Sequence, residues 1–265
     1  MQAEFGLSER KACRILRLSR TTKRHQPKDK GDAGVLTEIQ KIVKENPRFG
    51  CPRVQLFLRR GGMVINHKRT HRIYAEAGLQ LKNRPPKRRR RRPVAELPPP
   101  LRPRQKWSMD FVHDNLADGR AIRVLTILDE YTRECMALEV DTSLSSFRVI
   151  SVLERIAGEQ GLPEEFGVDS GPEFTSQEFA DWAKLRGIGI GFCTPGKKNE
   201  NAFIESFNSR LRDECLNMHW FLTLDEARDT IENWRDDYNF VRPHSSLGGM
   251  PPAEYFDGHR NFFSA

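Results

Sequence analysis

Paired cysteines are missing from this chain. Its 265 residues contain five cysteines, and no two of them are spaced as Cys-x-x-Cys. An odd number of widely separated cysteines argues against a disulfide framework. It indicates a reducing compartment, which we expect to be the cytoplasm.

Long apolar runs are also missing. No stretch approaches the roughly 18 residues that a membrane-spanning helix needs. Met1 begins a charged segment rather than the apolar core of a signal peptide. Hydrophobic residues still make up 37% of the chain, which is below the globular average but enough for a packed core. We therefore expect one or two folded domains and no membrane partner.

Charge is abundant and unevenly distributed. Residues 1–105 contain 28 Lys and Arg against 8 Asp and Glu, a net of +20. Residues 106–265 contain 16 against 28, a net of −12, and the whole chain carries +8. A basic part joined to an acidic part is expected of a phosphate-binding module attached to a metal-using catalytic domain. A globular protein with a basic disordered tail is the alternative that charge alone leaves open.

Three carboxylates lie in settings suited to a metal site. Asp110 lies in the strand-like run 106–112, Asp169 ends the stretch 166–169, and Glu205 follows Asp169 after 35 intervening residues. Mg²⁺ prefers a few carboxylate ligands, with water and substrate phosphate in the remaining positions. Two such ions about 4 Å apart can activate the attacking oxygen of a phosphodiester reaction and stabilise the leaving oxygen. We predict that these three acids are both catalytic residues and metal ligands.

Four motifs surround or follow these acids. They are Trp107-x-x-Asp110, Asp169-Ser-Gly-Pro-Glu-Phe174, Asn201-Ala-Phe-Ile-Glu-Ser-Phe207 and Tyr238-Asn239-x-x-Arg242-Pro-His-Ser-Ser-Leu247. Through them the chain, from about residue 35 to 256, resembles bacterial insertion-sequence transposases of the Asp-Asp-Glu superfamily, which have a retroviral-integrase-type core. The most similar group joins two overlapping reading frames, and this chain resembles the product of the downstream frame.

The resemblance implies an α/β fold, with an RNase-H-like integrase catalytic core and an N-terminal basic, helix-turn-helix-like domain. It implies two Mg²⁺ ions, for which Mn²⁺ could substitute, and double-stranded DNA as the partner, both as transposon ends and as target. The expected reaction cleaves DNA at a transposon end, and the freed 3′-hydroxyl then attacks a second phosphodiester. We also expect a homo-oligomer on DNA, the upstream-frame protein as a partner, and a nucleoid-associated location in the bacterial cytoplasm.

Two other functions remain open at this point. The first is a DNA-binding regulator derived from a transposase that no longer cuts, and the intact acids argue against it. The second is an RNase-H-like nuclease that hydrolyses without joining. The basic helical domain and the sequence Arg242-Pro243-His244 argue against that one.

Composition and turn signals divide the chain into four parts. Residues 1–34 are expected to be a remnant helical segment and a linker. Residues 35–80 are expected to be a helix-turn-helix-like domain of three short helices, the second opened by Pro52 and the third capped by Asn66. Residues 81–105 are expected to be a basic, Pro-rich linker, and 106–265 the catalytic core with a C-terminal helical tail. The single helix expected over 7–24 resembles the end of a helix-turn-helix whose earlier part is missing. Specific recognition of DNA ends is therefore expected to need the upstream-frame product.

Basic residues in three of these parts are expected to contact DNA. Six consecutive cations in the linker should remain extended and add affinity without sequence preference. Asn208 and Arg212 lie three and seven residues after Glu205 and so on the same helix face, and of these two only Arg212 is expected to contact DNA. The expected contacts are Lys68, Arg69, Arg72, Lys87, Arg88, Arg89, Arg90, Arg91, Arg92, Lys197, Lys198 and Arg212. For 35–80, a helical packing domain with a solvated basic face is the open alternative. Zinc binding by His67 and His71 is not expected, because no paired cysteines follow them.

In the core, strands and helices are expected to alternate. Strands are expected over 107–113, 122–128, 134–140, 166–168 and 188–192, with a turn at Asp118-Gly119 between the first two. Helices are expected from Ser143 or Ser145 to about residue 158, over 176–186, and around Glu205. Phe203, Phe207 and Leu211 recur every four residues and should pack on the sheet. Asp129 is expected to support the end of a hairpin, and the role of His244 stays open.

Overall fold

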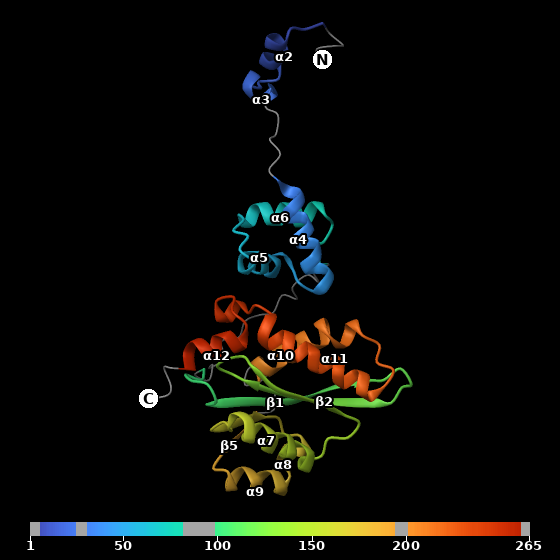
Figure 1. Cartoon of the computed structure of the whole chain (residues 1–265), viewed down its shortest axis with the longest axis vertical. Helices are drawn as coiled ribbons and strands as arrows, with labels where there is room; N and C mark the ends of the chain where they lie inside the picture. Colours follow the sequence, from blue (N-terminus) through green and yellow to red (C-terminus); the bar gives the residue numbers. More distant parts are fainter. Residues whose placement is uncertain (1–5, 25–30, 82–98, 194–200, 261–265) are drawn as a thin grey trace. The chain divides into compact units, whose positions relative to one another are not determined.

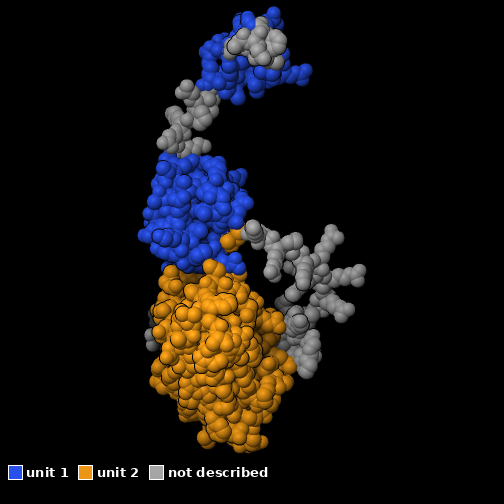
Figure 2. All heavy atoms as spheres, turned by 90° about the vertical axis from the view of Figure 1, so that its right-hand side faces the viewer, with its two compact units in different colours: residues 1–80 blue, residues 81–265 orange. Residues whose placement is uncertain are grey.

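The structure is a computed structural model that describes residues 6–24, 31–81, 99–193 and 201–260 (Figure 1). Contacts divide the chain into two compact units, unit 1 over residues 1–80 and unit 2 over residues 81–265 (Figure 2). The predicted DNA contacts Lys87–Arg92, Lys197 and Lys198 lie outside the described residues. Within the described residues, Cys13, Cys51, Cys135 and Cys215 are in no disulfide. Within the described ranges, no helix is both long enough and apolar enough to cross a bilayer.

The first described segment of unit 1 forms two short helices, where the sequence analysis predicted one. These are α2 (Glu9–Ile15) and α3 (Arg20–Arg24). Arg17 breaks the predicted helix because its φ of 52° is left-handed. The Ser19 hydroxyl then accepts a hydrogen bond from the Thr22 backbone N–H at 2.9 Å and caps the second helix.

Three helices form the remainder of unit 1: α4 (Asp32–Glu45), α5 (Cys51–Arg60) and α6 (His67–Glu76). Pro52 lies in the first turn of α5, and the Asn66 side chain caps α6 by accepting from Lys68 N, as the sequence predicted. The apolar faces enclose one small core made of Val35, Ile39, Ile42, Phe49, Val54, Leu58, Ile73 and Tyr74.

Unit 2 is built on a five-stranded mixed sheet in the order β3-β2-β1-β4-β5. Strands β1 and β2, and β2 and β3, pair antiparallel, whereas β4 pairs parallel with both β1 and β5. Gly119, with φ +87°, makes the predicted turn between β1 and β2. The strands are β1 (Lys106–Asn115), β2 (Ala121–Asp129), β3 (Cys135–Asp141), β4 (Glu165–Val168) and β5 (Gly189–Phe192).

Helices cover both faces of this sheet (Figure 1). One face packs against α7 (Ser146–Gln160), α8 (Pro172–Thr175) and α9 (Gln177–Leu185). The other face packs against α10 (Ala202–Glu214) and α11 (Leu224–Asp236). A short 3₁₀ turn at Leu216–Met218 joins α10 to α11. After α11 the tail continues through the π-helical turn η2 (Asp237–Val241) and a 3₁₀ turn at Ser245–Leu247 to α12 (Pro252–Arg260).

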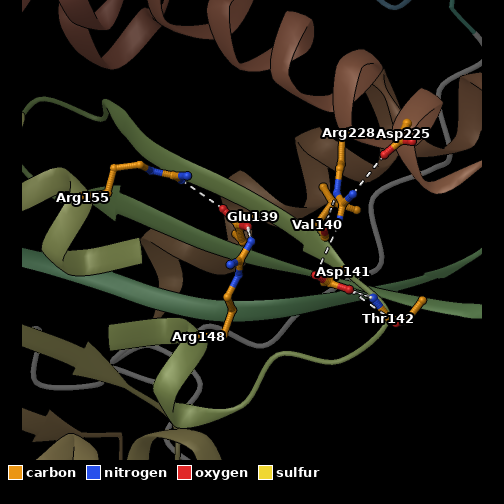
Figure 3. A network of polar contacts seen from close by, with 8 residues as sticks. All are labelled: Glu139, Val140, Asp141, Thr142, Arg148, Arg155, Asp225 and Arg228. Atoms are coloured by element: carbon orange, nitrogen blue, oxygen red, sulfur yellow. Dashed lines mark hydrogen bonds and ion pairs between the residues drawn. The ribbon is translucent and has the colours of Figure 1, made fainter. Parts of the chain in front are cut away.

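Arginines from both helical layers fix the edge strand β3 (Figure 3). Arg148 and Arg155 of α7 donate to the Glu139 carboxylate at 2.6 and 3.0 Å. Arg228 of α11 donates to the Val140 carbonyl at 3.1 Å. Satisfying a backbone group on an outer strand with a side chain also limits pairing with a foreign strand.

Candidate active site

Asp110 lies on the face of the sheet that α10 covers. Side chains alternate along β1, so Trp107 and Met109 enter the core beneath α7 and α9, whereas Val112 enters the core beneath α10. Asp110 shares the side of Val112 and is half-buried. The Thr126 hydroxyl on β2 donates to the Asp110 backbone carbonyl at 3.1 Å, which fixes the strand at this position. The carboxylate is thus carried by a rigid element.

Asp169 follows the neighbouring parallel strand β4. In the register of β1 and β4, Ser108 lies opposite Gly167, and two residues further along each strand come Asp110 and Asp169. Asp169 is exposed, and its Oδ1 accepts a hydrogen bond from the Gly171 N–H at 3.0 Å. A Cβ at position 171 would lie 2.9 Å from that oxygen, so a larger residue here would displace the Asp169 carboxylate.

Helix α10 brings Glu205 to the same region. Ile204, Phe207 and Leu211 are fully buried against the sheet, and they leave Glu205 on the exposed side. One turn after Glu205, Asn208 Nδ2 donates to Asp110 Oδ2 at 2.8 Å. Arg212 Nη2 donates to the His113 carbonyl at 2.8 Å. Two hydrogen bonds therefore join the predicted catalytic face of α10 to β1.

The three acids share a negative electrostatic environment. Burial raises the pKa of Asp110, and the nearby charges of Asp169 and Glu205 raise it further, whereas hydrogen bonds from Phe111 N–H and Asn208 lower it. Within the described parts of the chain, none of the three carboxylates is in an ion pair. A cation bound here would relieve this unfavourable concentration of charge.

The donor atoms suit a hard divalent cation, although they do not form a closed cage. Among the described residues, no three His, Cys, Asp or Glu side chains are grouped tightly enough to hold an ion. The Asn208 amide oxygen, however, is buried and has no hydrogen-bond partner in the described part of the chain. Carboxylate and amide oxygens are the ligands that Mg²⁺ and similar ions take, together with water and substrate phosphate. The chemistry of these residues therefore fits such an ion.

The predicted DNA contacts of unit 1 are less accessible than expected. Lys68 is exposed, but Arg69 Nε lies 2.8 Å from Asp32 Oδ1, and Arg72 pairs with both Asp32 and Glu76. These three basic residues and Asn66 line a cavity of about 340 Å³ at the start of α6. Two of the three cations are thus held by carboxylates of their own domain.

Asp129 and His244 have structural environments. Asp129 is buried and accepts from the Trp107 indole at 3.1 Å and from the backbone N–H of Tyr131 and Thr132, so it supports the end of the β2–β3 hairpin as predicted. His244 is buried with its ring packed edge-on against Tyr238, 4.6 Å between centroids. Its contacts assign it a packing role.

Sequence reasoning placed Asn208 on the same helix face as Glu205 but gave it no role. Its spacing of three residues from Glu205 is the signal that could have identified it, because residues three apart on a helix are neighbours. The pairing of Arg242 with Glu214 was missed for a different reason. Those residues are 28 positions apart, and no local pattern predicts such a contact.

Family comparisons match most of the chain. Two families described as Integrase core domain match residues 100–198 and 186–252. A family described as HTH-like domain matches residues 30–90. The predicted α/β integrase-type core with an N-terminal helix-turn-helix-like domain is therefore confirmed.

Proteins of insertion elements are similar along most of their length. The IS476 uncharacterized 39.2 kDa protein of Xanthomonas euvesicatoria is 42% identical over 258 residues, covering 96% of this chain and 74% of that protein. The IS407 uncharacterized 31.7 kDa protein of Burkholderia multivorans is 40% identical over 265 residues, covering 98% and 94%. Transposase InsF for insertion sequence IS3A of Escherichia coli is 24% identical over 283 residues, covering 96% and 95%.

A solved structure shows the same fold at lower sequence identity. The simian T-cell lymphotropic virus intasome, solved in complex with the PP2A regulatory subunit B56 gamma, contains a chain that matches with a TM-score of 0.55 and 16% identity. The match covers 82% of this chain and 73% of that chain.

Proposed function

This chain belongs to the IS3-family transposases, and on that premise we propose that it cuts DNA at transposon ends and joins those ends to a target. Members of this family act on DNA. The observation that carries the finer proposal is the hydrogen bond from Asn208 to Asp110. It joins the strand that bears Asp110 to the helix that bears Glu205, next to the strand that Asp169 follows.

In this proposal Asp110, Asp169 and Glu205 hold the divalent ions, two Mg²⁺ or in their place Mn²⁺. Such ions, when bound, supply activation of the attacking oxygen and stabilisation of the leaving oxygen of the phosphodiester. Asn208 orients the Asp110 carboxylate, and its buried amide oxygen, which has no hydrogen-bond partner among the described residues, is available to a further ligand of the site. The 3′-hydroxyl that cleavage frees then attacks the target phosphodiester, so no covalent enzyme–DNA intermediate is needed.

The same proposal assigns DNA contacts to both units. Arg212 is exposed on the Glu205 face of α10, where it can meet a phosphate. The cavity lined by Lys68, Arg69 and Arg72 lies at a helix N-terminus, a favourable place for an anion. We further propose a homo-oligomer on DNA and the upstream-frame protein as a partner, since two ends and a target must be joined in one reaction.

The decisive experiment uses labelled DNA that carries the element's terminal sequence, with Mg²⁺ or Mn²⁺. We expect cleavage that exposes a 3′-hydroxyl, followed by joined products, and neither product when the ions are chelated. The chain is assayed alone and with the upstream-frame protein, and scrambled DNA is the matched control. Cleavage without joining would favour a nuclease, and DNA binding without cleavage in any of these conditions would favour a regulator.

A further inference from the structure

The rear face of α10 is held by the C-terminal tail of the chain. Glu214 is nine positions after Glu205, about two and a half helical turns, so the two side chains point in opposite directions. Arg242 donates from Nε and Nη2 to the two Glu214 carboxylate oxygens at 2.8 and 2.7 Å. Both side chains are buried, with exposed fractions of 5% and 9%. A two-point bond between planar groups fixes orientation as well as distance.

A second contact holds the middle of the helix. The Tyr238 ring packs edge-on against Phe207, with 4.9 Å between centroids and an interplanar angle of 87°. Phe207 lies between Glu205 and Asn208 in position along α10. The Arg242 guanidinium carbon lies 5.6 Å from the centroid of the same tyrosine ring. The ion pair and the aromatic contact are therefore parts of one cluster.

The tail is in turn fixed to the sheet. The π-helical turn η2 places the adjacent residues Tyr238 and Asn239 in the interior, where both are 1% exposed. Asn239 accepts from the Cys135 N–H and donates to the Cys135 carbonyl, both at 2.9 Å, in the manner of a neighbouring strand. Through these two hydrogen bonds at the start of β3, the tail is fixed to the sheet that carries Asp110.

We propose that Tyr238, Asn239 and Arg242 form a tail clamp, a set of positioning residues that fixes the rotation of α10 and thereby the place of Glu205. The inference rests on the proposed function. The apolar contacts of Ile204, Phe207 and Leu211 hold α10 on the sheet, but hydrophobic burial has no direction. Directional bonds to the rear of the helix resist rotation. A catalytic group displaced by about 1 Å can lose about 100-fold in rate.

The principal test replaces both members of the buried pair, Glu214→Leu with Arg242→Leu. A single substitution would leave a buried charge without its partner, and that alone destabilises strongly. In the full chain, we expect the folded double variant to bind end DNA with KM within about twofold of wild type and to cleave with kcat about 10- to 100-fold lower. The double variant should also bind Mn²⁺ more weakly than the wild-type chain in a titration followed by electron paramagnetic resonance. This measurement does not depend on DNA cleavage.

Glu139→Gln is the matched control. Glu139 is also buried and also bonds two arginines, but these come from α7 rather than from the tail (Figure 3). It should lower the melting temperature while leaving kcat and Mn²⁺ affinity unchanged. A folded double variant with wild-type kcat and Mn²⁺ affinity would overturn the clamp, as would an equal loss of both in Glu139→Gln.

A second variant, Asn239→Ala, tests the same proposal if the double variant does not fold. Asn239→Ala releases the tail from β3 without changing any side chain on α10, and we expect the same direction of change in kcat and Mn²⁺ affinity. Wild-type values in this variant would also overturn the clamp. If the wild-type chain binds Mn²⁺ but does not cleave, the proposed function fails, and the Mn²⁺ titrations of the variants still decide the clamp.

Discussion

The ion pairs of Arg69 and Arg72 in unit 1 differ in burial from the ion pair of Arg242 in unit 2. In unit 1 the ion pairs of Arg69 and Arg72 with Asp32 lie near the surface, with side chains 32% to 41% exposed. In unit 2 the Arg242–Glu214 pair is almost completely buried. Exposed pairs contribute little to stability and can exchange partners, whereas a buried pair holds one geometry. The difference fits the proposed roles of the two units, which are DNA binding by unit 1 and a fixed orientation of α10 in unit 2.

Unit 2 also separates its acids into two kinds. Glu139 and Glu214 are buried and satisfied by arginines. The charges of Asp169 and Glu205 raise the pKa of Asp110, and within the described residues none of the three carboxylates is in an ion pair. Part of the net negative charge of residues 106–265 is therefore at the candidate site, where a bound divalent cation would balance it.

The largest expected effect comes from removing that uncompensated charge. We predict that Asp110→Asn, Asp169→Asn or Glu205→Gln each lowers the cleavage rate by more than about 100-fold, because each loses a charged metal ligand with little change in volume. DNA affinity, measured by gel shift, should stay near wild type. Asp114→Asn, on the same strand as Asp110, is the matched control and should cleave normally. A near-wild-type rate in any of the three variants would remove that residue from the site.

The features that were predicted correctly from the sequence depend on residues close together in the chain. The Asn66 cap, the Asp118-Gly119 turn and the stripe of Phe207 and Leu211 depend on neighbours within a few positions, and all are found as expected. The contacts that were missed join distant positions. Asn239 bonds Cys135 across 104 residues, and no local pattern contains that information.

The same distinction accounts for one of two features of unit 1 that the sequence did not predict. DNA contact by Arg69 and Arg72 stays a prediction, but their pairing with Asp32, 37 and 40 positions away, was not predicted. The single helix expected over 7–24 is two helices, because the pattern of apolar residues did not reveal the left-handed conformation of Arg17. For the candidate site, sequence identified the three acids but not Asn208 as the link between two of their elements.

A second prediction concerns the run of six basic residues Lys87–Arg92. Replacing Lys87–Arg92 with neutral residues should weaken binding to end DNA and to random DNA alike, by about tenfold or more at low salt. The salt dependence of log K should become shallower by roughly 0.9 for each phosphate that the variant no longer neutralises. Exchange of the five arginines for lysine keeps the charge and should keep the slope. An unchanged slope in the neutral variant would mean that this run does not meet DNA.

A third prediction concerns Glu134, an acid of unit 2 whose nearby arginines do not offset the effect of burial on its pKa. Burial, reinforced by the charge of Asp129, raises the pKa of Glu134 to about 7, although Arg104 and Arg235 lower it. The folded state therefore favours the protonated acid, and stability is lost as pH rises from the ordinary carboxyl range through about 7. Glu134→Gln should be more stable than wild type by about 2 kcal/mol at pH 8 and close to wild type at pH 4. Urea unfolding at both pH values measures this, and equal differences at the two would contradict it.

The last and smallest predicted effect concerns Asp32 in unit 1 and its influence on DNA affinity. Hydrogen bonds from Arg72 and Arg69 lower the pKa of Asp32, so this carboxylate is ionised at neutral pH and competes with DNA phosphates for the same two guanidinium groups. Asp32→Asn removes that competitor. We expect affinity for random DNA to rise about threefold and the salt slope to steepen by up to about 0.9 for each arginine released.

Asp225→Asn provides the control for this change, because Asp225 is an exposed partner of Arg228 in unit 2 and its loss should leave DNA affinity unchanged. Both variants are compared with wild type by fluorescence anisotropy over a series of salt concentrations. Weaker binding by folded Asp32→Asn would show that Asp32 positions the two arginines for DNA instead of withholding them. In that case the exposed ion pairs of Asp32 would fix the orientation of Arg69 and Arg72, as the buried pair with Glu214 is proposed to fix α10. The exposure of an ion pair would then not predict its role.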